Sequence, residues 1–466
     1  MTTAAAPAAL RAVVLAAGAG VRMWPFGETQ PKPLLPVAAE PLLAATVREI
    51  AAAGVGEVRV AVGGPHARAL QGWCLLTGEA VPVAAEASGT AVSMLSAIED
   101  DSGPWLCVYG DVWFPRGVLA ELVSCHRADP TAAVALLSPL GSERPQDWIC
   151  ADPGPGGLLA GFQGHPRSGG CRSGGAFVLP AGFGRFLAGN PGGGVSVPVG
   201  GMPHSEADLE QSINLFVRHG GRVHALVRPT VDLDKPWHLL QANLEAMAER
   251  FSGIEGTVCA PDATISPDAD IRAPVILAAG AELGPGVIVR APLLIGPGSR
   301  VTDRVIVAGP TILGSDVEAT DGAYLEEVVL GDGVRIGHGA EVSGVVMDGA
   351  YIVHYCQISG VVGRSVDIGA ATVCGSLRFD DGASRQWVGE RPEGRWETPA
   401  VHANACYFGD FCRTGVNVTL TPGRTIGAFS CVGPGLVVQE DVPARTRVLV
   451  RQEVVRAPWG PERYGW

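Results

Sequence analysis

Apolar residues recur at every sixth position through much of the C-terminal half of this 466-residue chain. An α-helix repeats every 3.6 residues, so a sustained period of six excludes a helix. Glycine follows many of these positions, as in LGPG, IGPG, LGSD and LGDG, which suits a turn after each short strand. This is the hexapeptide signature of a parallel β-helix, whose coils stack apolar side chains on one another. The positions are Ile265, Ile271, Leu277, Leu283, Val289, Ile295, Val301, Val307, Leu313, Ala319 and Leu325, then, after a slip of one residue, Leu330, Ile336 and Val342, and later Leu420, Ile426, Val432 and Val438.

Two segments depart from this period. Residues 379–400, FDDGASRQWVGERPEGRWETPA, interrupt it and are predicted to form an excursion loop. Residues 451–466 contain Pro, Arg and two Trp and are expected to form a cap or a packed tail. Glycine accounts for 64 of the 466 residues, and this share is about twice the usual ~7%. Such a glycine content is typical of a turn-rich repeat.

The N-terminal half follows a different pattern. Short runs such as ALRAVVLAAG, EVRVAVGG and WLCVYGD alternate with helical patterns such as PLLAATVREIAAAGV and DLEQSINLFVRHG. This alternation predicts βαβ units and a mostly parallel sheet with helices on both faces, which is a doubly wound α/β domain. We therefore divide the chain into a disordered tail (1–9), an α/β domain (10–250), a β-helix (251–450) and a C-terminal tail (451–466).

Charge and cysteine content restrict the partners. With 34 Lys and Arg against 47 Asp and Glu, the net charge of −13 repels nucleic-acid backbones and acidic membrane surfaces, so neither is an expected partner. No stretch reaches the ~18 uninterrupted apolar residues of a membrane span. The 11 cysteines include no CxxC pair, which indicates neither a disulfide framework nor a zinc site and fits a reducing cytoplasm.

The segment VVLAAGAGVRMWPFGETQPKPLLPV runs from a buried strand into a glycine-rich turn. Glycine there lets backbone N–H groups approach a phosphate chain, although GxG alone is equally typical of a tight strand-to-helix turn. Arg22 lies two residues after Gly20, and Lys32 stands between two prolines. Lys32 and Lys235 are the only lysines, so each is taken to mark a place that needs a compact ammonium group. The whole string closely resembles the signature of the sugar-1-phosphate nucleotidylyltransferases.

The resemblance covers nearly the whole chain and implies both a fold and an activity. The family has an α/β N-terminal domain, and its longer members carry a left-handed β-helix behind it. We therefore expect a doubly wound, Rossmann-like nucleotidyltransferase domain followed by a left-handed parallel β-helix of hexapeptide repeats. The expected reaction joins a nucleoside triphosphate to a sugar 1-phosphate, or a sugar-like cyclitol phosphate, and releases pyrophosphate. The sequence leaves the base unassigned.

The resemblance also implies roles for residues of the glycine-rich string. Gly18 and Gly20 would wrap the nucleotide phosphates. Arg22 would hold the pyrophosphate leaving group, and Lys32 would neutralise charge on the reacting phosphates. Without the upstream string, a lysine between two prolines would be read as a solvated loop residue.

Further residues match the family at three later positions. Gly89 and Thr90, in GTAVSML, would meet the base or the sugar. Asp111, in VYGDVWF, follows a strand, the favoured ligand position in an open α/β sheet, and resembles the family's metal-binding aspartate. Asp232, in TVDLDKPWHLLQAN, matches the second metal aspartate. Asp234 is its close competitor, since an Asp before a helix is often an N-cap.

The chemistry explains these residue types. An anionic sugar phosphate must attack an anionic α-phosphate, so charge repulsion and positioning dominate the barrier. Two carboxylates with few other protein ligands suit Mg²⁺, which retains waters and binds substrate phosphates. Mg²⁺ is therefore the expected cofactor, and no side-chain nucleophile is required.

The sequence departs from the family where the acceptor should bind. In GFQGHPRSGGCRSGGAFVLP, Gln163, Gly164 and His165 replace an expected Glu and Lys, and Ser173 replaces an expected Asn. A lone His in such a loop is more often a surface residue than a phosphate contact. Either the acceptor is an unusual sugar or cyclitol phosphate, or the domain has lost activity.

The β-helix suggests further alternatives. Its MDGAYIVHYCQISG segment resembles the acetyltransferase region of bifunctional relatives, in which His354, before Tyr355, would be the general base. Asp367 and Ser376 stand where Asn is expected, and TPAVHANA lacks the expected Lys. The β-helix is expected to assemble a homo-oligomer. The chain also resembles non-catalytic regulatory parts of a translation-factor exchange complex.

Overall fold

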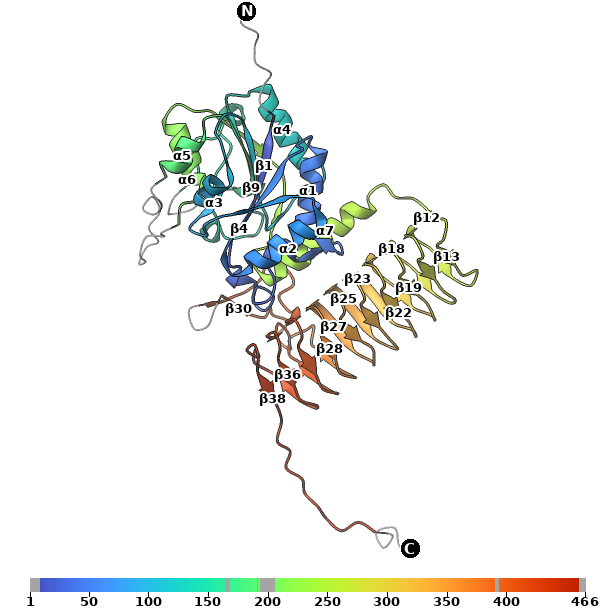
Figure 1. Ribbon diagram of the computed structural model, residues 1–466. Helices are drawn as coiled ribbons and strands as arrows, with labels where there is room; N and C mark the ends of the chain where they lie inside the picture. Colours follow the sequence, from blue (N-terminus) through green and yellow to red (C-terminus); the bar gives the residue numbers. More distant parts are fainter. Residues whose placement is uncertain (1–8, 164–167, 191, 193–205, 390–393, 461–466) are drawn as a thin grey trace, which may run out of the picture.

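The computed structural model describes residues 9–163, 168–190, 192, 206–389 and 394–460 (Figure 1). An α/β domain lies against one side of a long β-helix, and helix α7 (Pro236–Phe251) leads from the first to the second. The first residues of the N-terminal tail and the last six residues of the C-terminal tail lie outside the described ranges.

The α/β domain is built on a sheet with strand order β10-β8-β9-β6-β1-β4-β5. All its neighbouring strands pair in parallel except β9, which runs antiparallel to both β6 and β8. The predicted mostly parallel sheet is confirmed. The strands are β1 (Arg11–Ala16), β4 (Val58–Val62), β5 (Val81–Ala84), β6 (Trp105–Tyr109), β8 (Ala133–Pro139), β9 (Cys171–Leu179) and β10 (Val223–Val227).

Helices cover both faces of this sheet, because successive strand residues point to opposite sides. Val14 of β1 belongs to a core that includes residues of α1, α2 and α4, whereas Val13 belongs to a second core with residues of α3, α5 and α6. The doubly wound prediction is therefore confirmed. The helices are α1 (Leu42–Ala52), α2 (Ala67–Thr77), α3 (Thr90–Ala97), α4 (Val118–Ala128), α5 (Gly184–Ala188) and α6 (Leu209–Arg218).

The C-terminal half is the predicted left-handed parallel β-helix. Most of the predicted hexapeptide positions fill its continuous apolar core, and the slip of one residue falls at a register shift between Leu325 and Val328. One ladder of parallel strands is β13 (Thr264–Ile265), β16 (Glu282–Leu283), β19 (Arg300–Val301), β22 (Glu318–Ala319), β24 (Arg335–Ile336), β26 (Tyr351–Ile352), β28 (Asp367–Ile368), β33 (Arg413–Thr414), β36 (Cys431–Val432) and β38 (Arg447–Val448).

Two further ladders complete the coils. The longer one is β12 (Thr257–Cys259), β15 (Val275–Leu277), β18 (Leu293–Ile295), β21 (Thr311–Leu313), β23 (Tyr324–Leu330), β25 (Glu341–Val346), β27 (Gln357–Val362), β29 (Val373–Cys374), β34 (Thr419–Leu420) and β37 (Val437–Val438). Joined to it are β14 (Asp270–Ile271), β17 (Ile288–Val289), β20 (Ile306–Val307), β32 (Cys406–Phe408) and β35 (Thr425–Ile426).

The segments that break the repeat differ in structure. The excursion contains an antiparallel hairpin of β30 (Gln386–Val388) and β31 (Arg395–Glu397). Residues 451–460 form no helix or strand and are almost entirely exposed, so this described part of the tail does not pack as expected.

The two domains share an apolar core. Phe26, in the segment after β1, packs edge-to-face on Tyr407 of β32 with ring centroids 6.4 Å apart. The phosphate-loop candidate segment therefore rests directly on the β-helix. This core includes, from the two domains, Met23, Phe26, Leu35, Val37, Leu240, Val345, Met347, Val361 and Tyr407.

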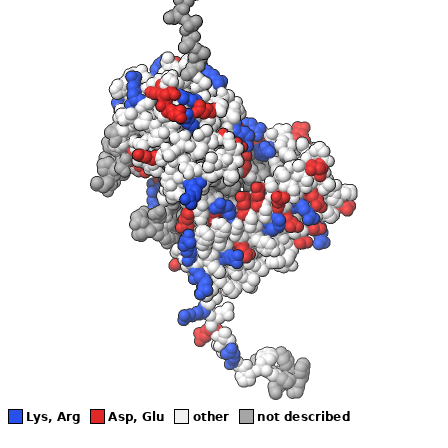
Figure 2. Space-filling view, in the orientation of Figure 1, with Lys and Arg blue, Asp and Glu red and all other residues white. Residues whose placement is uncertain are grey.

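Acidic and basic side chains are interspersed on the face of the β-helix seen in Figure 2. Some of them pair between successive coils, as Arg300 does with Glu282 at 2.9 Å. No helix in the described ranges is both long enough and apolar enough to cross a bilayer.

Candidate functional site

The glycine-rich turn begins directly after the buried strand β1. Gly18 is exposed, and a Cβ added to it would meet no atom within 4 Å. Gly20 has a φ of +70°, a left-handed conformation that glycine adopts without the steric penalty a Cβ would bring. A Cβ at Gly20 would lie 3.4 Å from Cγ of Lys32, so the turn lies over the aliphatic part of that lysine.

Lys32 connects this turn to the aspartates. Its Nζ lies 3.1 Å from Asp111 Oδ2 and 3.9 Å from Asp234 Oδ1. Burial alone would lower the pKa of Lys32, but the carboxylates of Asp111, Asp234 and Asp232 outweigh it and raise the pKa above its ordinary value. Lys32 is therefore a fixed positive charge among three carboxylates.

Asp111 and Asp232 come together through a short antiparallel strand pair. Asp111 precedes β7 (Val112–Trp113), which pairs with β11 (Val231–Asp232), and Leu233 N–H donates to the Asp111 carbonyl at 2.8 Å. Burial, and then the nearby charge of Asp111, raises the pKa of Asp232. The two predicted metal ligands thus share one site, where an added positive charge would favour their ionised forms.

Asp234 does not act as a helix cap. Helix α7 begins at Pro236, and its N-cap residue Lys235 makes no side-chain capping hydrogen bond. The Asp234 carboxylate is instead buried, with Oδ1 3.0 Å from Arg22. Burial would raise the pKa of Asp234, but Lys32 and Arg22 lower it. Among the described residues its Oδ2 has no hydrogen-bond partner, so one buried oxygen of this carboxylate is unsatisfied.

The donor set fits a cation that needs few protein ligands. No group of three or more His, Cys, Asp or Glu side chains is arranged to hold a metal ion among the residues the structure describes. Asp111 and Asp232 alone would leave most of a coordination shell to water and phosphate oxygens. Mg²⁺ binds in this way, whereas structural zinc requires a full set of protein ligands.

Gly89 and Thr90 lie where α3 packs on the start of α6. Gly89 has a φ of +122°, and a Cβ there would lie 2.4 Å from the backbone nitrogen of Ala207. Thr90 Oγ1 accepts a hydrogen bond from Leu209 N–H at 2.7 Å. The structure therefore gives both residues a packing role, and the predicted contact with base or sugar remains a proposal.

Comparison with known proteins identifies this domain. Residues 12–167 match the family model of the MobA-like NTP transferase domain. Over these residues the N-terminal domain is similar to MobA-like NTP transferases, and it is called the NTP transferase domain after this match. Its matched region contains Gly18, Gly20, Arg22, Lys32 and Asp111. The matched region ends before Asp232, which reaches the site through β11.

The similarity to known proteins extends along almost the entire chain. It is 25% identical over 452 residues to the bifunctional sugar-1-phosphate nucleotidylyltransferase/acetyltransferase of Sulfurisphaera tokodaii, covering 93% of this chain and 98% of that protein. It is 25% identical over 448 residues to the bifunctional protein GlmU of Methanococcus maripaludis, covering 95% and 98% respectively. A solved UDP-glucose pyrophosphorylase from Acinetobacter baumanii is 18% identical over 52% of this chain and 95% of that one, with a TM-score of 0.42. The family resemblance predicted from sequence is confirmed.

Ser173, in the stretch expected to bind the acceptor, contacts a buried carboxylic acid that the sequence interpretation missed. Ser173 donates a hydrogen bond to Glu210 Oε1 at 2.7 Å, and the Tyr109 hydroxyl donates to Glu210 at 3.0 Å. Burial, and then the nearby Asp208, raises the pKa of Glu210 to about 7. The sequence did contain one sign of this buried acid, because Glu210 stands next to the apolar positions of α6. The Gln163 side chain accepts hydrogen bonds from its loop neighbour Ser168, while Gly164 and His165 lie outside the described residues.

Glu210→Gln is expected to change how stability depends on pH. The folded protein holds the Glu210 proton more tightly than the unfolded chain, so this contribution to the free energy of unfolding is complete below about pH 4.5 and is lost as the pH rises to about 7. The Gln variant lacks this loss. Thermal unfolding at about pH 5 and about pH 8 should therefore show a smaller decrease in Tm for the variant than for the wild type. Parallel decreases in both proteins would contradict the assignment.

Lys235, the second lysine, joins the NTP transferase domain to the hairpin of the β-helix. Its Nζ lies 2.7 Å from Glu397 Oε2 and 3.8 Å from Asp147 Oδ2, and Arg395 lies 3.2 Å from Asp147. This network borders a cavity of about 530 Å³, whose lining includes Trp113, Glu143, Trp148, Arg172, Lys235, His238 and Glu397. The predicted need for an ammonium group at this position thus has a structural explanation in domain contact.

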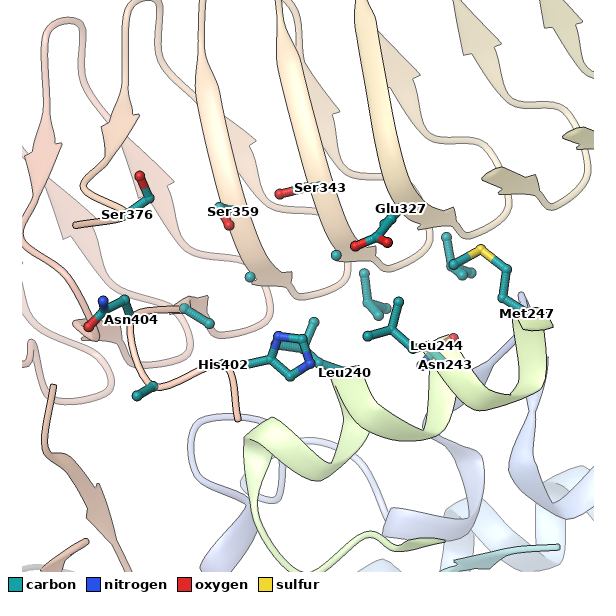
Figure 3. Close-up of a pocket in the computed structure, with 16 residues that line it drawn as sticks. Leu240, Asn243, Leu244, Met247, Glu327, Ser343, Ser359, Ser376, His402 and Asn404 are labelled. Atoms are coloured by element: carbon teal, nitrogen blue, oxygen red, sulfur yellow. The ribbon is translucent and has the colours of Figure 1, made fainter. Parts of the chain in front are cut away.

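A second cavity, of about 330 Å³, lies between α7 and the corners of the coils (Figure 3). The helix contributes an apolar wall, and the coil corners contribute Glu327 and serines from successive strands. The predicted nucleotide and metal residues are not part of its lining, which includes Leu240, Asn243, Leu244, Met247, Glu327, Ser343, Ser359, Ser376, His402 and Asn404.

His354 lies on an exposed turn of the β-helix. Its Nδ1 is 3.1 Å from His338 Nε2 on the preceding coil, and the His338 ring packs edge-to-face on Tyr355. Asp367 is also exposed on the following coil, whereas Ser376 faces the cavity of Figure 3. The residues grouped around His354 are not those grouped around Lys32, so any chemistry at His354 would use a different set of side chains.

Proposed function

We propose that the protein transfers a nucleoside monophosphate from an NTP to a sugar 1-phosphate, or a sugar-like cyclitol phosphate, and releases pyrophosphate. The observation that carries this proposal is the charge cluster beside the glycine-rich turn, in which Lys32 and Arg22 meet Asp111, Asp232 and Asp234 within one site. Similarity along almost the whole chain to an enzyme named for this reaction supports it.

The residues suggest a division of roles. The exposed turn from Gly18 to Gly20 offers backbone N–H groups to the triphosphate. Lys32 would place positive charge where negative charge develops on the reacting phosphate, and Arg22, half exposed and paired with Asp234, would contact the departing pyrophosphate. In-line attack by the sugar phosphate needs no side-chain nucleophile, so positioning and charge compensation supply the catalysis.

Mg²⁺ is the cofactor that this donor set favours. Asp111 and Asp232 would hold it, and when bound it would compensate charge on the phosphates. Burial, and then the nearby charge of Asp111, raises the pKa of Asp232, which supports the proposal because a divalent cation would favour the ionised forms of both carboxylates.

The acceptor is proposed to differ from common hexose phosphates. Ser173, which replaces the expected Asn, already donates its hydroxyl to Glu210, so it has no second proton for a sugar oxygen. A site without the expected donors should bind the matching sugar hydroxyls weakly.

The test is a panel of the common NTPs against sugar and cyclitol 1-phosphates, read by pyrophosphate release. We expect turnover with at least one pair and poor turnover with glucose and N-acetylglucosamine 1-phosphates. Gln163→Glu combined with Gly164→Lys should raise the use of glucose 1-phosphate. A wild-type kcat/KM for glucose 1-phosphate equal to that of every other acceptor would refute the acceptor proposal. Silence with every pair would instead favour a non-catalytic subunit.

Acetyl transfer is a second candidate, favoured by the pairing of His354 with His338 on an exposed turn. The panel should therefore include acetyl-CoA with amino-sugar 1-phosphates, read by release of the free thiol. Loss of thiol release in His354→Ala, with pyrophosphate release retained, would establish a second site.

We further propose that the β-helix assembles copies of this chain and that the protein works in a reducing cytoplasm. Phe411 and Phe429 stack on successive coils with ring centroids 5.0 Å apart, and both are more than 40% exposed, 42% and 43% respectively. Such paired aromatic rings suit contact with a second surface. None of the 11 cysteines, all of which lie in the described ranges, forms a disulfide, a state that a reducing compartment would preserve.

A further inference from the structure

Asp410 is a fully buried carboxylate on a turn of the β-helix, yet its partners come from both domains. Its Oδ2 accepts hydrogen bonds from Thr29 Oγ1 and from Gln30 Nε2, each at 3.0 Å. Arg364, on the preceding coil, donates to the same oxygen from Nε at 2.8 Å. Asp410 therefore links the β-helix to the segment that leads into Lys32.

The position of Asp410 in the repeat explains part of these contacts. Asp332, Asp348, Arg364 and Asp410 each lie three residues before a strand of the ladder β24, β26, β28 and β33. In this turn the carboxylate accepts a backbone N–H from the coil before it. The bonds are Ser315 N–H to Asp332 at 2.6 Å, Asp332 N–H to Asp348 at 2.9 Å and Arg364 N–H to Asp410 at 2.9 Å.

Asp410 does more than this repeated role requires. Asp332 is exposed, and its carboxylate hydrogen bond stays within the β-helix. Asp410 accepts hydrogen bonds from Arg364 on both oxygens, and it also accepts bonds from Thr29 on Oδ2 and from Gln30 on both oxygens, so it contacts the other domain as well as the coil. The same turn thus provides a matched comparison between a carboxylate that only holds a coil and one that also holds the NTP transferase domain.

Gln30 is well placed to transmit this contact to the site. Only Pro31 separates it from Lys32, and proline fixes φ, so the intervening backbone has little freedom. The Gln30 side chain is buried, and its amide also lies 3.4 Å from Met347 Sδ of the β-helix. Displacing Gln30 would therefore displace the ammonium group that faces Asp111.

We propose that Asp410, acting through Gln30 and Thr29, is a positioning residue for nucleotidyl transfer, so the β-helix completes the active site of the NTP transferase domain. This inference rests on the proposed function. A misplacement of about 1 Å in a charge that stabilises a transition state can cost about 10²-fold in rate.

The first test compares Asp410→Asn with Asp332→Asn in the full chain, using the NTP and acceptor pair found by the panel. Asp410→Asn should lower kcat by about 10-fold to 10²-fold while the KM for the NTP changes less than about threefold, because positioning acts mainly in the transition state. Asp332→Asn should leave both constants close to wild type. Equal effects of the two substitutions, or a kcat of Asp410→Asn within about twofold of wild type, would overturn the proposal.

Gln30→Ala and the double variant separate positioning from folding. If Asp410 acts through Gln30, the losses in kcat should be clearly less than additive in the double variant. Additive losses would show that the two residues act independently and would overturn the proposal. Gln30→Ala also keeps the question open to experiment should Asp410→Asn fail to fold.

Hydrogen exchange provides a readout that does not depend on turnover. Amides of residues 21–35 should exchange faster in Asp410→Asn than in the wild type and should be unchanged in Asp332→Asn. Unchanged exchange in Asp410→Asn would overturn the inference whatever the activity. Faster exchange in Asp410→Asn, together with no pyrophosphate release by the wild type with any substrate pair, would show that the proposed function, rather than the contact, is at fault.

Discussion

Replacing either Asp111 or Asp232 by Asn is expected to lower pyrophosphate release by about 10³-fold, the upper range for loss of one fixed electrostatic group. The two carboxylates meet through the pairing of β7 with β11, and an amide supplies neither the charge nor the affinity that a divalent cation needs. EDTA should silence the wild type, and added Mg²⁺ should restore it.

The fold should survive these substitutions. Burial and the neighbouring Asp111 already disfavour the charge on Asp232, so Asp232→Asn should not lower Tm. Asp234→Asn is the comparison, because Asp234 holds Arg22 at 3.0 Å and is expected to orient that side chain. It should retain measurable turnover. A dead Asp234→Asn beside an active Asp232→Asn would move the metal site by two residues.

Lys32→Ala is expected to lower kcat/KM by about 10² or more. The substitution removes the ammonium that lies 3.1 Å from Asp111 and leaves three carboxylates without their shared positive charge. The measurement is steady-state pyrophosphate release at varied NTP concentration.

Lys32→Arg should not restore the activity. The lysine stem passes close to Gly20, and the ammonium lies between two carboxylates, so a larger planar guanidinium cannot take the same place. Turnover near the wild-type level in either variant would contradict the role given to Lys32.

Much of the fold could be predicted because its signals are local. Each hexapeptide carries its own apolar residue and turn, and each βα unit carries its own periodicity, so the order of domains and strands follows from short windows of sequence. The glycine-rich turn, Lys32 and Asp111 were recognisable for the same reason. They lie in short sequence segments whose residue types and spacing match the nucleotidylyltransferase family.

The remaining features depend on contacts between distant parts of the chain. Gln30 and Asp410 are 380 residues apart, and Asp410 stands in the same Gly-Asp-x-x-Arg pattern as Asp332 on an equivalent turn. Asp234 resembled a helix cap until the structure placed Arg22 against it. Glu210 acquires its unusual pKa only from burial between elements that the sequence presents separately.

The repeated turn that carries Asp410 also sets the permitted length of the β-helix. Parallel strands are spaced about 4.8 Å apart, so inserting or deleting one whole coil ahead of Asp410 would move that carboxylate by more than a hydrogen bond tolerates. Coils after β33 lie beyond this contact and can vary in number more freely. The number of coils between the end of α7 and β33 therefore determines whether the turn with Asp410 reaches the NTP transferase domain.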